Sequence, residues 1–315
     1  MSPRWKWDFE ERAPESSGSS PSPARADALS HRMRVRRRRG AAAVLLIGVL
    51  TVIVAAGSGS NHARKRPPLS TPPDGHVAYQ QLHHAPEESP TAAVKSVLAY
   101  TPFVKEGGDR GRDIALTFDD GPGPYTPGVL DVLERLHVHA TFFEIGEMLR
   151  YFSASTLREL RDGDVIGDHT ETHPEMATLS ARDQREELFE QIARIELLGG
   201  PRPVLFRPPY GSFNATTMRE LHAMHLLMVL WSVDTEDYQQ PGVSVIVQRA
   251  LAGAHPGAII LMHDAGGTRT QTIAALPIII RDLRAGGFRL VTVPELLRDD
   301  PPPPGQPLPS SLRGD

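Results

Sequence analysis

The sequence between residues 113 and 298 alternates short apolar runs with segments of helical spacing, and this alternation limits the folds that the chain can adopt. The apolar runs of strand length are 114–118, 140–145, 165–166, 204–206, 226–231, 258–262 and 289–292. The helix-like segments between them are 127–136, 155–162, 181–198, 215–224, 244–251 and 272–285. Strands that alternate with helices predict βα units around a parallel sheet. About seven such units predict an α/β fold with a closed or nearly closed barrel.

The segments outside this region differ from it in composition. Residues 1–40 are polar, end in a run of arginines and are predicted to be a disordered cytoplasmic segment. Residues 41–59 carry no charge and approach the roughly 20 residues that cross a bilayer, which predicts a single transmembrane signal anchor with the rest of the chain outside the cell membrane. Residues 60–110 are predicted to be a Pro-rich linker, 111–299 the folded domain and 300–315 a Pro-rich tail.

Three features of this N-terminal part leave alternatives open. Val54-Ala55-Ala56 also fits a signal-peptidase site, which would give a cleaved and secreted form. The apolar content of residues 94–104 fits an earlier start of the domain. The arginine run also has the composition of a nucleic-acid patch. Its position against the apolar span favours a role in membrane topology, and a net charge of -4 gives no general case for nucleic acid.

The first apolar run of the domain ends in two adjacent acids, Asp119 and Asp120, followed by Gly121-Pro122. Carboxylates this close disfavour each other's charged form, so a bound cation, or different tasks for the two acids, would resolve the conflict. The alternative is a pair of aspartates that caps the next helix. The chain contains no cysteine, so Cys-ligated zinc and a disulfide scaffold are excluded, and a metal could be held only by histidine and carboxylate.

Ionisable residues also follow the later strands, at the end where barrel enzymes build their active sites. They are Asp168, His169 and His173; Arg207; Asp234 and Asp237; and His263 and Asp264. The four-residue spacing of His169 and His173 puts them on one face if the segment is helical. Pro174 disfavours the helical conformation at His173, so a tight turn or loop fits as well as a helix. Two histidines and one carboxylate leave a position open for water or substrate, as in catalytic zinc sites. The alternative is a pair of exposed loop histidines.

Short motifs in this order resemble those of the polysaccharide deacetylases, the family with the NodB homology domain (carbohydrate esterase family 4). They are Thr117-Phe118-Asp119-Asp120-Gly121-Pro122, His169-Thr170-x-x-His173, Arg207-Pro208-Pro209-Tyr210, Asp234-x-x-Asp237-Tyr238 and Leu261-Met262-His263. The resemblance covers roughly residues 113–298. It implies a distorted (β/α) barrel, which the family usually builds from about seven parallel strands.

The resemblance also implies roles for the residues of these motifs. Asp120, His169 and His173 would bind one divalent metal ion, Zn²⁺ or alternatively Co²⁺. Asp119 would be the general base, with Arg207 orienting it.

For the departure of the amine, the resemblance implies that His263 donates a proton to the leaving nitrogen. Asp237 would be the acid that keeps the His263 imidazole charged. The backbone N–H of Tyr210 would assist the oxyanion, and Leu261 and Tyr238 would line the pocket for the acetyl methyl group. The family often has Trp at the position of Tyr238, which leaves the acyl preference open. The roles of Asp168 and Asp234 are open as well.

The sequence therefore predicts a metal-dependent enzyme that removes N-acetyl groups from an extracellular glycan containing N-acetylglucosamine, either peptidoglycan or a chitin-like polymer. Its expected partners are this glycan and, through its own N-terminal helix, the membrane. One alternative is an O-acetyl esterase of xylan type on the same fold. Another is a catalytically silent glycan-binding protein of the cell wall. The sequence does not indicate the oligomeric state.

Overall fold

The computed structural model describes residues 90–307 of the chain. The predicted cytoplasmic segment, the signal anchor at 41–59 and most of the predicted linker lie outside these residues, so they stay predictions. Within the described part, none of the helices has both the length and the apolar character that a membrane span requires.

A sheet of parallel strands forms the centre of the described part. The strands are β1 Phe103–Val104, β2 Asp113–Gly121, β3 Thr141–Glu144, β4 Val165–Asp168, β5 Leu205–Phe206, β6 Leu227–Val229, β7 Val233–Asp234, β8 Ile259–His263 and β9 Arg289–Val291. Their order is β1-β6-β5-β4-β3-β2-β8-β7, and β9 pairs with the first half of β2. Among residues 90–307 no ladder joins β7 to β1, so the barrel stays open.

The observed strands are parallel and lie where the sequence predicts them, but there are more of them than predicted. Each of the predicted apolar runs overlaps one strand, and all strand pairs are parallel. The additional strands β1 and β7 have two residues each and lie outside the predicted apolar runs. The expected strand count of about seven is therefore too low.

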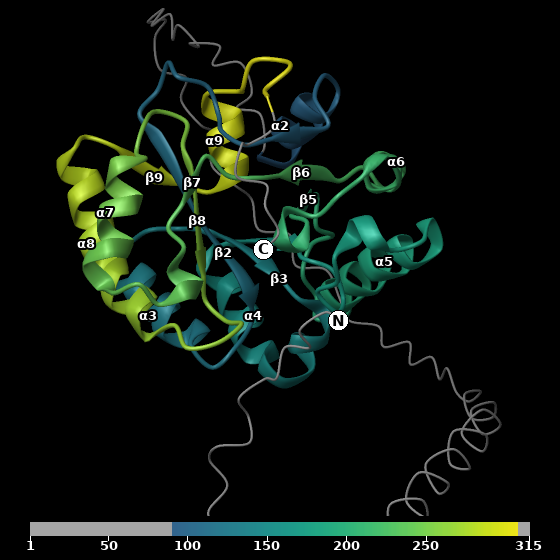
Figure 1. Cartoon of the computed structure of the whole chain (residues 1–315), viewed down its shortest axis with the longest axis horizontal. Helices are drawn as coiled ribbons and strands as arrows, with labels where there is room; N and C mark the ends of the chain where they lie inside the picture. Colours follow the sequence, from purple (N-terminus) through teal and green to yellow (C-terminus); the bar gives the residue numbers. More distant parts are fainter. Residues whose placement is uncertain (1–89, 308–315) are drawn as a thin grey trace, which may run out of the picture. The chain divides into compact units, whose positions relative to one another are not determined.

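Helices connect most of the successive strands and cover the sheet (Figure 1). They are α2 Pro90–Leu98, α3 Thr126–Leu136, α4 Leu149–Asp162, α5 Ala181–Leu197, α6 Ala215–Met224, α7 Val243–Ala252, α8 Thr270–Ala285 and α9 Val293–Asp299. Short 3₁₀ turns follow several strands: η2 Gly146–Met148, η3 Met176–Thr178, η4 Pro209–Gly211 and η5 Asp237–Gln239. Because α2 packs beside α9 and β1 pairs with β6, the folded unit begins before the predicted boundary at residue 111.

Strand β2 divides its side chains between two faces, because successive residues of a strand point in opposite directions. Leu116 and Phe118 are buried in the apolar cluster formed with α3, α7 and α8, helices that lie together on one side of β2 and β8 (left in Figure 1). Phe118 stacks on Phe142 of β3 with ring centroids 5.2 Å apart. Thr117 and Asp119 take the opposite face, so the alternation of β2 brings the first acid to the inside of the barrel.

Candidate active site

The two adjacent acids end β2 at a break in its pairing with β3. The register shifts between Asp119 and Gly121, and Asp120 has φ 73°. Asp tolerates this left-handed conformation better than most residues do. The shift brings both carboxylates close to His169, whose Nε2 lies 3.8 Å from Asp119 and 3.6 Å from Asp120. The next helix is capped by Tyr125 without a side-chain bond, so the alternative of a helix-capping pair is wrong.

Gly121 makes room for a buried acid from the neighbouring strand. A Cβ at residue 121 would lie 2.5 Å from a carboxylate oxygen of Asp264. The same oxygen accepts a hydrogen bond from the Thr126 hydroxyl, which in turn accepts one from the Gly123 N–H at 2.7 Å. Burial raises the pKa of Asp264 to about 8. The network joins the end of β8 to the first turn of α3, and the sequence analysis had assigned no role to Asp264.

The two predicted histidines lie on a loop, residues 169–173, that follows β4. Thr170 and His173 have φ of 70° and 61°, so of the two alternatives left open by the sequence the segment is a turn and not a helix. Nε2 of His173 lies 3.1 Å from Oδ1 of Asp120. Burial alone would raise the pKa of Asp120, but His173 and His169 outweigh it and hold this pKa well below the ordinary value.

The donor set of Asp120, His169 and His173 fits a divalent metal ion. One ligand atom from each lies within 4.8 Å of the others, and within residues 90–307 no other such group of three or more His, Cys, Asp or Glu is found. His169 Nδ1 donates to the carbonyl of Arg207 at 2.8 Å, and its Nε2 lies 3.6 Å from Asp120. His173 Nδ1 lies 3.1 Å from the Tyr210 hydroxyl oxygen, within hydrogen-bond distance. Metal-binding histidines are commonly oriented by such a contact at the other ring nitrogen.

Arg207 holds one oxygen of Asp119. Its guanidinium is fully buried and donates to Asp119 Oδ1 at 2.7 Å and to the Thr117 hydroxyl at 2.9 Å. Further bonds reach the carbonyls of Val229 and Leu230. Burial lowers the pKa of Arg207 and the charge of Asp119 opposes this effect. The second oxygen of Asp119 is not held by Arg207 and faces His169.

His263 ends β8 directly opposite Asp119 in the register of β2 and β8. Its Nδ1 lies 2.8 Å from Asp237, which also accepts the His263 backbone N–H at 2.9 Å and the Thr272 hydroxyl at 2.7 Å. Burial would lower the pKa of His263, but the Asp237 carboxylate outweighs it and raises this pKa to about 9. The imidazole is therefore charged at neutral pH and able to donate a proton from Nε2.

The residues expected to contact substrate occupy different environments. Tyr210 in η4 has φ 58°, and its ring packs edge-on against His173 with centroids 4.6 Å apart. Tyr238 is 38% exposed and packs edge-on against His263. Leu261 is buried in β8 within the apolar cluster that includes Trp231. Two tyrosines thus border the histidines at the strand ends, while Leu261 lies deeper.

Asp168 and Asp234, whose roles the sequence left open, each bond to the backbone two residues further along the chain. Oδ1 of Asp168 accepts the Thr170 N–H at 2.7 Å, and Oδ1 of Asp234 accepts the Glu236 N–H at 2.8 Å. Each aspartate thereby shapes the loop that follows its own strand. The sequence analysis missed Thr272, whose hydroxyl supports Asp237, because a threonine in the first turn of a helix carries no signal of such a contact.

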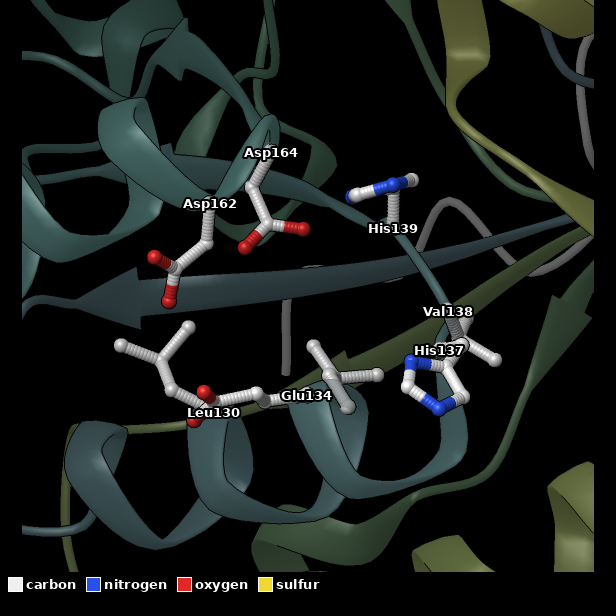
Figure 2. A pocket seen from close by; sticks show the side chains of 8 residues that line it. Leu130, Glu134, His137, Val138, His139, Asp162 and Asp164 are labelled. Carbon is white, nitrogen blue, oxygen red and sulfur yellow. The ribbon is translucent and has the colours of Figure 1, made fainter.

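A pocket of 260 Å³ with several ionisable residues lies at the other end of the strands (Figure 2). It is lined by Leu130, Leu133, Glu134, His137, Val138, His139, Asp162 and Asp164. These residues precede β3 and β4, whereas the residues of the motifs follow their strands. Asp164 accepts the Ala140 N–H at 2.8 Å at the entry to β3. The pocket is therefore separate from the group formed by Asp120, His169 and His173.

Comparison with known proteins gives consistent matches. Residues 106–229 match the family model described as polysaccharide deacetylase. A peptidoglycan-N-acetylglucosamine deacetylase of Bacillus cereus is 40% identical over 196 residues, which cover 59% of this chain and 88% of the relative. A chitooligosaccharide deacetylase of Rhizobium leguminosarum is 35% identical, covering 64% of this chain and 99% of the relative. The chain spans only 39% of PgdA, the peptidoglycan-N-acetylglucosamine deacetylase of Listeria monocytogenes, to which it is 38% identical.

Solved structures extend the likeness to three dimensions. The Bc1960 peptidoglycan N-acetylglucosamine deacetylase has a TM-score of 0.61 at 34% identity, covering 64% of this chain and 94% of that one. BA3943 of Bacillus anthracis, described as a family pseudoenzyme, has a TM-score of 0.59 at 30% identity, covering 62% of this chain and 69% of that one. The open parallel barrel, the ordered motifs and these matches agree: the chain belongs to the polysaccharide deacetylase family.

Proposed function

We propose that this chain is a metal-dependent polysaccharide N-deacetylase that removes acetyl groups from an extracellular glycan containing N-acetylglucosamine, peptidoglycan or a chitin-like polymer. One observation carries the proposal. A carboxylate held by arginine, Asp119, and a charged imidazole, His263, lie on neighbouring strand ends beside a three-residue ligand group. Relatives named for peptidoglycan and chitooligosaccharide deacetylation support the substrate class.

The metal would be held by Asp120, His169 and His173. When bound, a divalent ion supplies Lewis acidity toward the acetamide carbonyl and lowers the pKa of water. Zn²⁺ is the proposed ion because two histidines and one carboxylate form a common catalytic zinc set, and Co²⁺ is the alternative.

The chain's own residues perform the proton transfers. The Asp119 oxygen that Arg207 leaves unbonded takes a proton from the water that attacks the acetamide carbon. Arg207 donates to the other oxygen of Asp119 and so fixes the direction of this carboxylate. His263 then gives its Nε2 proton to the amine nitrogen as the C–N bond breaks, and Asp237 stabilises the charged imidazole before that step. The products are acetate and a glucosamine residue of the glycan.

The alternative of a silent glycan-binding protein is disfavoured by the residues themselves. The pseudoenzyme in the family means that family membership alone does not guarantee activity. In this chain, each position to which the resemblance assigns acid, base or ligand chemistry holds a residue that is able to perform it.

The location of the enzyme is proposed from the sequence. An uncharged apolar segment at 41–59 follows a dense arginine run, which places the domain outside the cell membrane in a single-pass protein, with a cleaved and secreted form as the alternative. Protease added to intact cells should release or degrade the domain. Complete protection of the domain would contradict this topology.

The experiment that tests the proposed function measures acetate release from peptidoglycan, chitin oligomers and acetylxylan by the full chain. The chain is assayed after metal removal and after reloading with Zn²⁺ or Co²⁺. Asp120→Ala should abolish release, and Asp109→Ala, at an exposed aspartate, should not. Release from acetylxylan alone would favour the esterase alternative, and release without metal would contradict the mechanism.

A further inference from the structure

The loop that carries both histidines, residues 169–173, has a backbone conformation that needs external support. Thr170 and His173 are non-glycine residues with positive φ, a strained conformation that persists only where surrounding contacts hold it. Inside the loop, the Thr170 hydroxyl accepts the His173 N–H at 2.9 Å. From η2, the N–H groups of Gly146 and Glu147 donate to the carbonyls of Thr170 and Glu171 at 2.9 Å each.

Helix α5 provides the side-chain support, through the residues that lie between the two histidines. Arg194 forks onto Glu171, with Nε 2.6 Å from Oε2 and 2.9 Å from Oε1, and Nη2 also donates to Oε1. Glu187 accepts both the N–H and the hydroxyl of Thr172 at 2.7 Å. Gln191, between them on the helix, donates to the carbonyl of Glu144 at the end of β3 at 3.2 Å. These three residues form one polar stripe on α5, because positions i, i+4 and i+7 share a helix face.

The polar stripe can support the loop only if α5 itself is held in place. The neighbouring apolar stripe of α5 does this. Leu188, Ile192 and Ile195 have the same spacing one residue further along, and all are fully buried against the sheet. At its N-terminus, Ser180 caps the helix by accepting the Asp183 N–H. An apolar face thus anchors α5 to the sheet while the adjacent polar stripe reaches the histidine loop.

We infer that the polar stripe of α5 positions His169 and His173 for metal binding, with Arg194 and Glu187 as positioning residues that contact neither metal nor substrate. The inference rests on the proposed function in that it takes a metal ion to be bound there. Glu171 is only 4% exposed and the Arg194 side chain 23%, so their fork is less screened by water than the bonds to the exposed Thr172 and holds the loop more firmly. Outer contacts of this kind typically change metal affinity by roughly 10–100-fold.

The chain offers a matched control on the same helix. Arg185 forks onto Glu220 of α6, with Nε and Nη2 2.8 Å and 3.0 Å from its two oxygens. The side chain of Glu220 is 8% exposed and that of Glu171 is 6% exposed, so both forks hold a buried carboxylate. The Arg185 fork does not reach the histidine loop. It therefore separates the loss of a buried ion pair from the loss of loop positioning.

The test is a Zn²⁺ titration of the metal-free full chain, with thermal unfolding measured on the same samples. Arg194→Ala should weaken Zn²⁺ binding by about 10–100-fold, whereas Arg185→Ala should leave the dissociation constant within about twofold. The Co²⁺ absorption spectrum should change in Arg194→Ala and not in Arg185→Ala. Equal dissociation constants for the two variants and the wild type would overturn the inference.

Two variants that remove fewer contacts test the inference if Arg194→Ala does not fold. Thr172→Val removes only the hydroxyl donor to Glu187, and Glu187→Gln removes one of the two acceptors without changing the shape. Each should weaken Zn²⁺ binding by a smaller factor than Arg194→Ala, and unchanged affinity in both would overturn the inference. A wild-type chain that binds neither Zn²⁺ nor Co²⁺ would overturn the proposed function together with it, so the two failures are distinguishable.

Discussion

Asp119 and Asp120 are neighbours in sequence but have different surroundings. Asp119 is bonded by a fully buried arginine, and Asp120 faces two histidines. The left-handed backbone of Asp120 separates the two carboxylates without turning either away from the strand end. Two like charges can coexist at this point because each has its own positive or proton-donating partner.

At the residue scale, His263 should be required for turnover and not for metal binding. His263→Ala removes the proton donor to the amine and should lower kcat by about 10²–10⁴-fold, the usual contribution of general acid catalysis. Zn²⁺ binding, measured by metal analysis after dialysis, should stay at the wild-type level. His222→Ala, at an exposed histidine on α6, serves as the control. Loss of metal in His263→Ala would mean that this imidazole is a ligand.

The pH dependence of kcat/KM follows from the pairing of His263 with Asp237. His263 has its pKa raised to about 9 by Asp237, so its protonated, active form persists through neutral pH and is lost as the pH rises through that value. Asp237→Asn removes the carboxylate that raises this pKa, so the basic limb of the kcat/KM profile should move to lower pH. An unchanged basic limb in this variant would contradict the assignment of His263 as the acid.

At the scale of elements, the contact between β8 and α3 buries an acid that titrates near neutrality. The pKa of Asp264 is raised by burial to about 8, so folding favours its protonated form. The folded state then binds more protons than the unfolded one between about pH 4 and pH 8, and stability falls as the pH rises through this range. The acid therefore destabilises the fold most at high pH.

Asp264→Asn should consequently stabilise the fold at pH 8. The amide keeps an acceptor for the Thr126 hydroxyl and carries no charge. The thermal midpoint should rise by at least about 2 °C at pH 8 and change little at pH 4, where both side chains are neutral. Asp109→Asn, at an exposed aspartate, is the control. A lower midpoint at pH 8 would contradict the account of this contact.

The elements also mark how far the sequence could predict the structure. The apolar run 114–118 and its counterparts were sufficient to locate most strands, because buried parallel strands are continuous apolar runs. The strands β1 and β7 were not predicted, because β7 contains only one apolar residue and β1 ends the region 94–104, which the sequence left open between linker and domain. From the motifs it could be predicted that the ligand group and Arg207 lie at one edge of the sheet. The contacts of Glu187 and Arg194 could not be predicted. They join a helix face to a loop, and such pairs have no signature along the chain.

At the scale of the whole domain, the two ends of the described chain are tied together. Asp300 accepts the N–H groups of Arg110 and Gly111 at 2.6 Å and 2.7 Å, and Arg110 Nε at 3.0 Å. Tyr100 and Gln306 add bonds between the same two regions. Residues that the composition assigned to a linker and a tail therefore contribute to the fold.

Removal of this link should lower stability and leave the active site intact. Asp300→Ala removes the carboxylate that accepts the partly buried N–H groups of Arg110 and Gly111 and should cost roughly 1–3 kcal/mol of unfolding free energy. Urea denaturation checks the loss, and Asp109→Ala, at an exposed aspartate nearby, is the control. The Zn²⁺ dissociation constant should be unchanged. A wild-type denaturation midpoint would mean that the two ends do not contribute to the fold.

The most direct test of the account measures bound metal and acetate release on the same samples of wild type, Asp119→Asn and Asp120→Asn. The division of tasks predicts that Asp119→Asn retains the metal while its turnover falls by about 10²–10⁴-fold. It also predicts that Asp120→Asn loses both. Loss of metal in Asp119→Asn, or acetate release by Asp120→Asn at the wild-type rate, would contradict the central claim that the adjacent acids divide catalysis and metal binding.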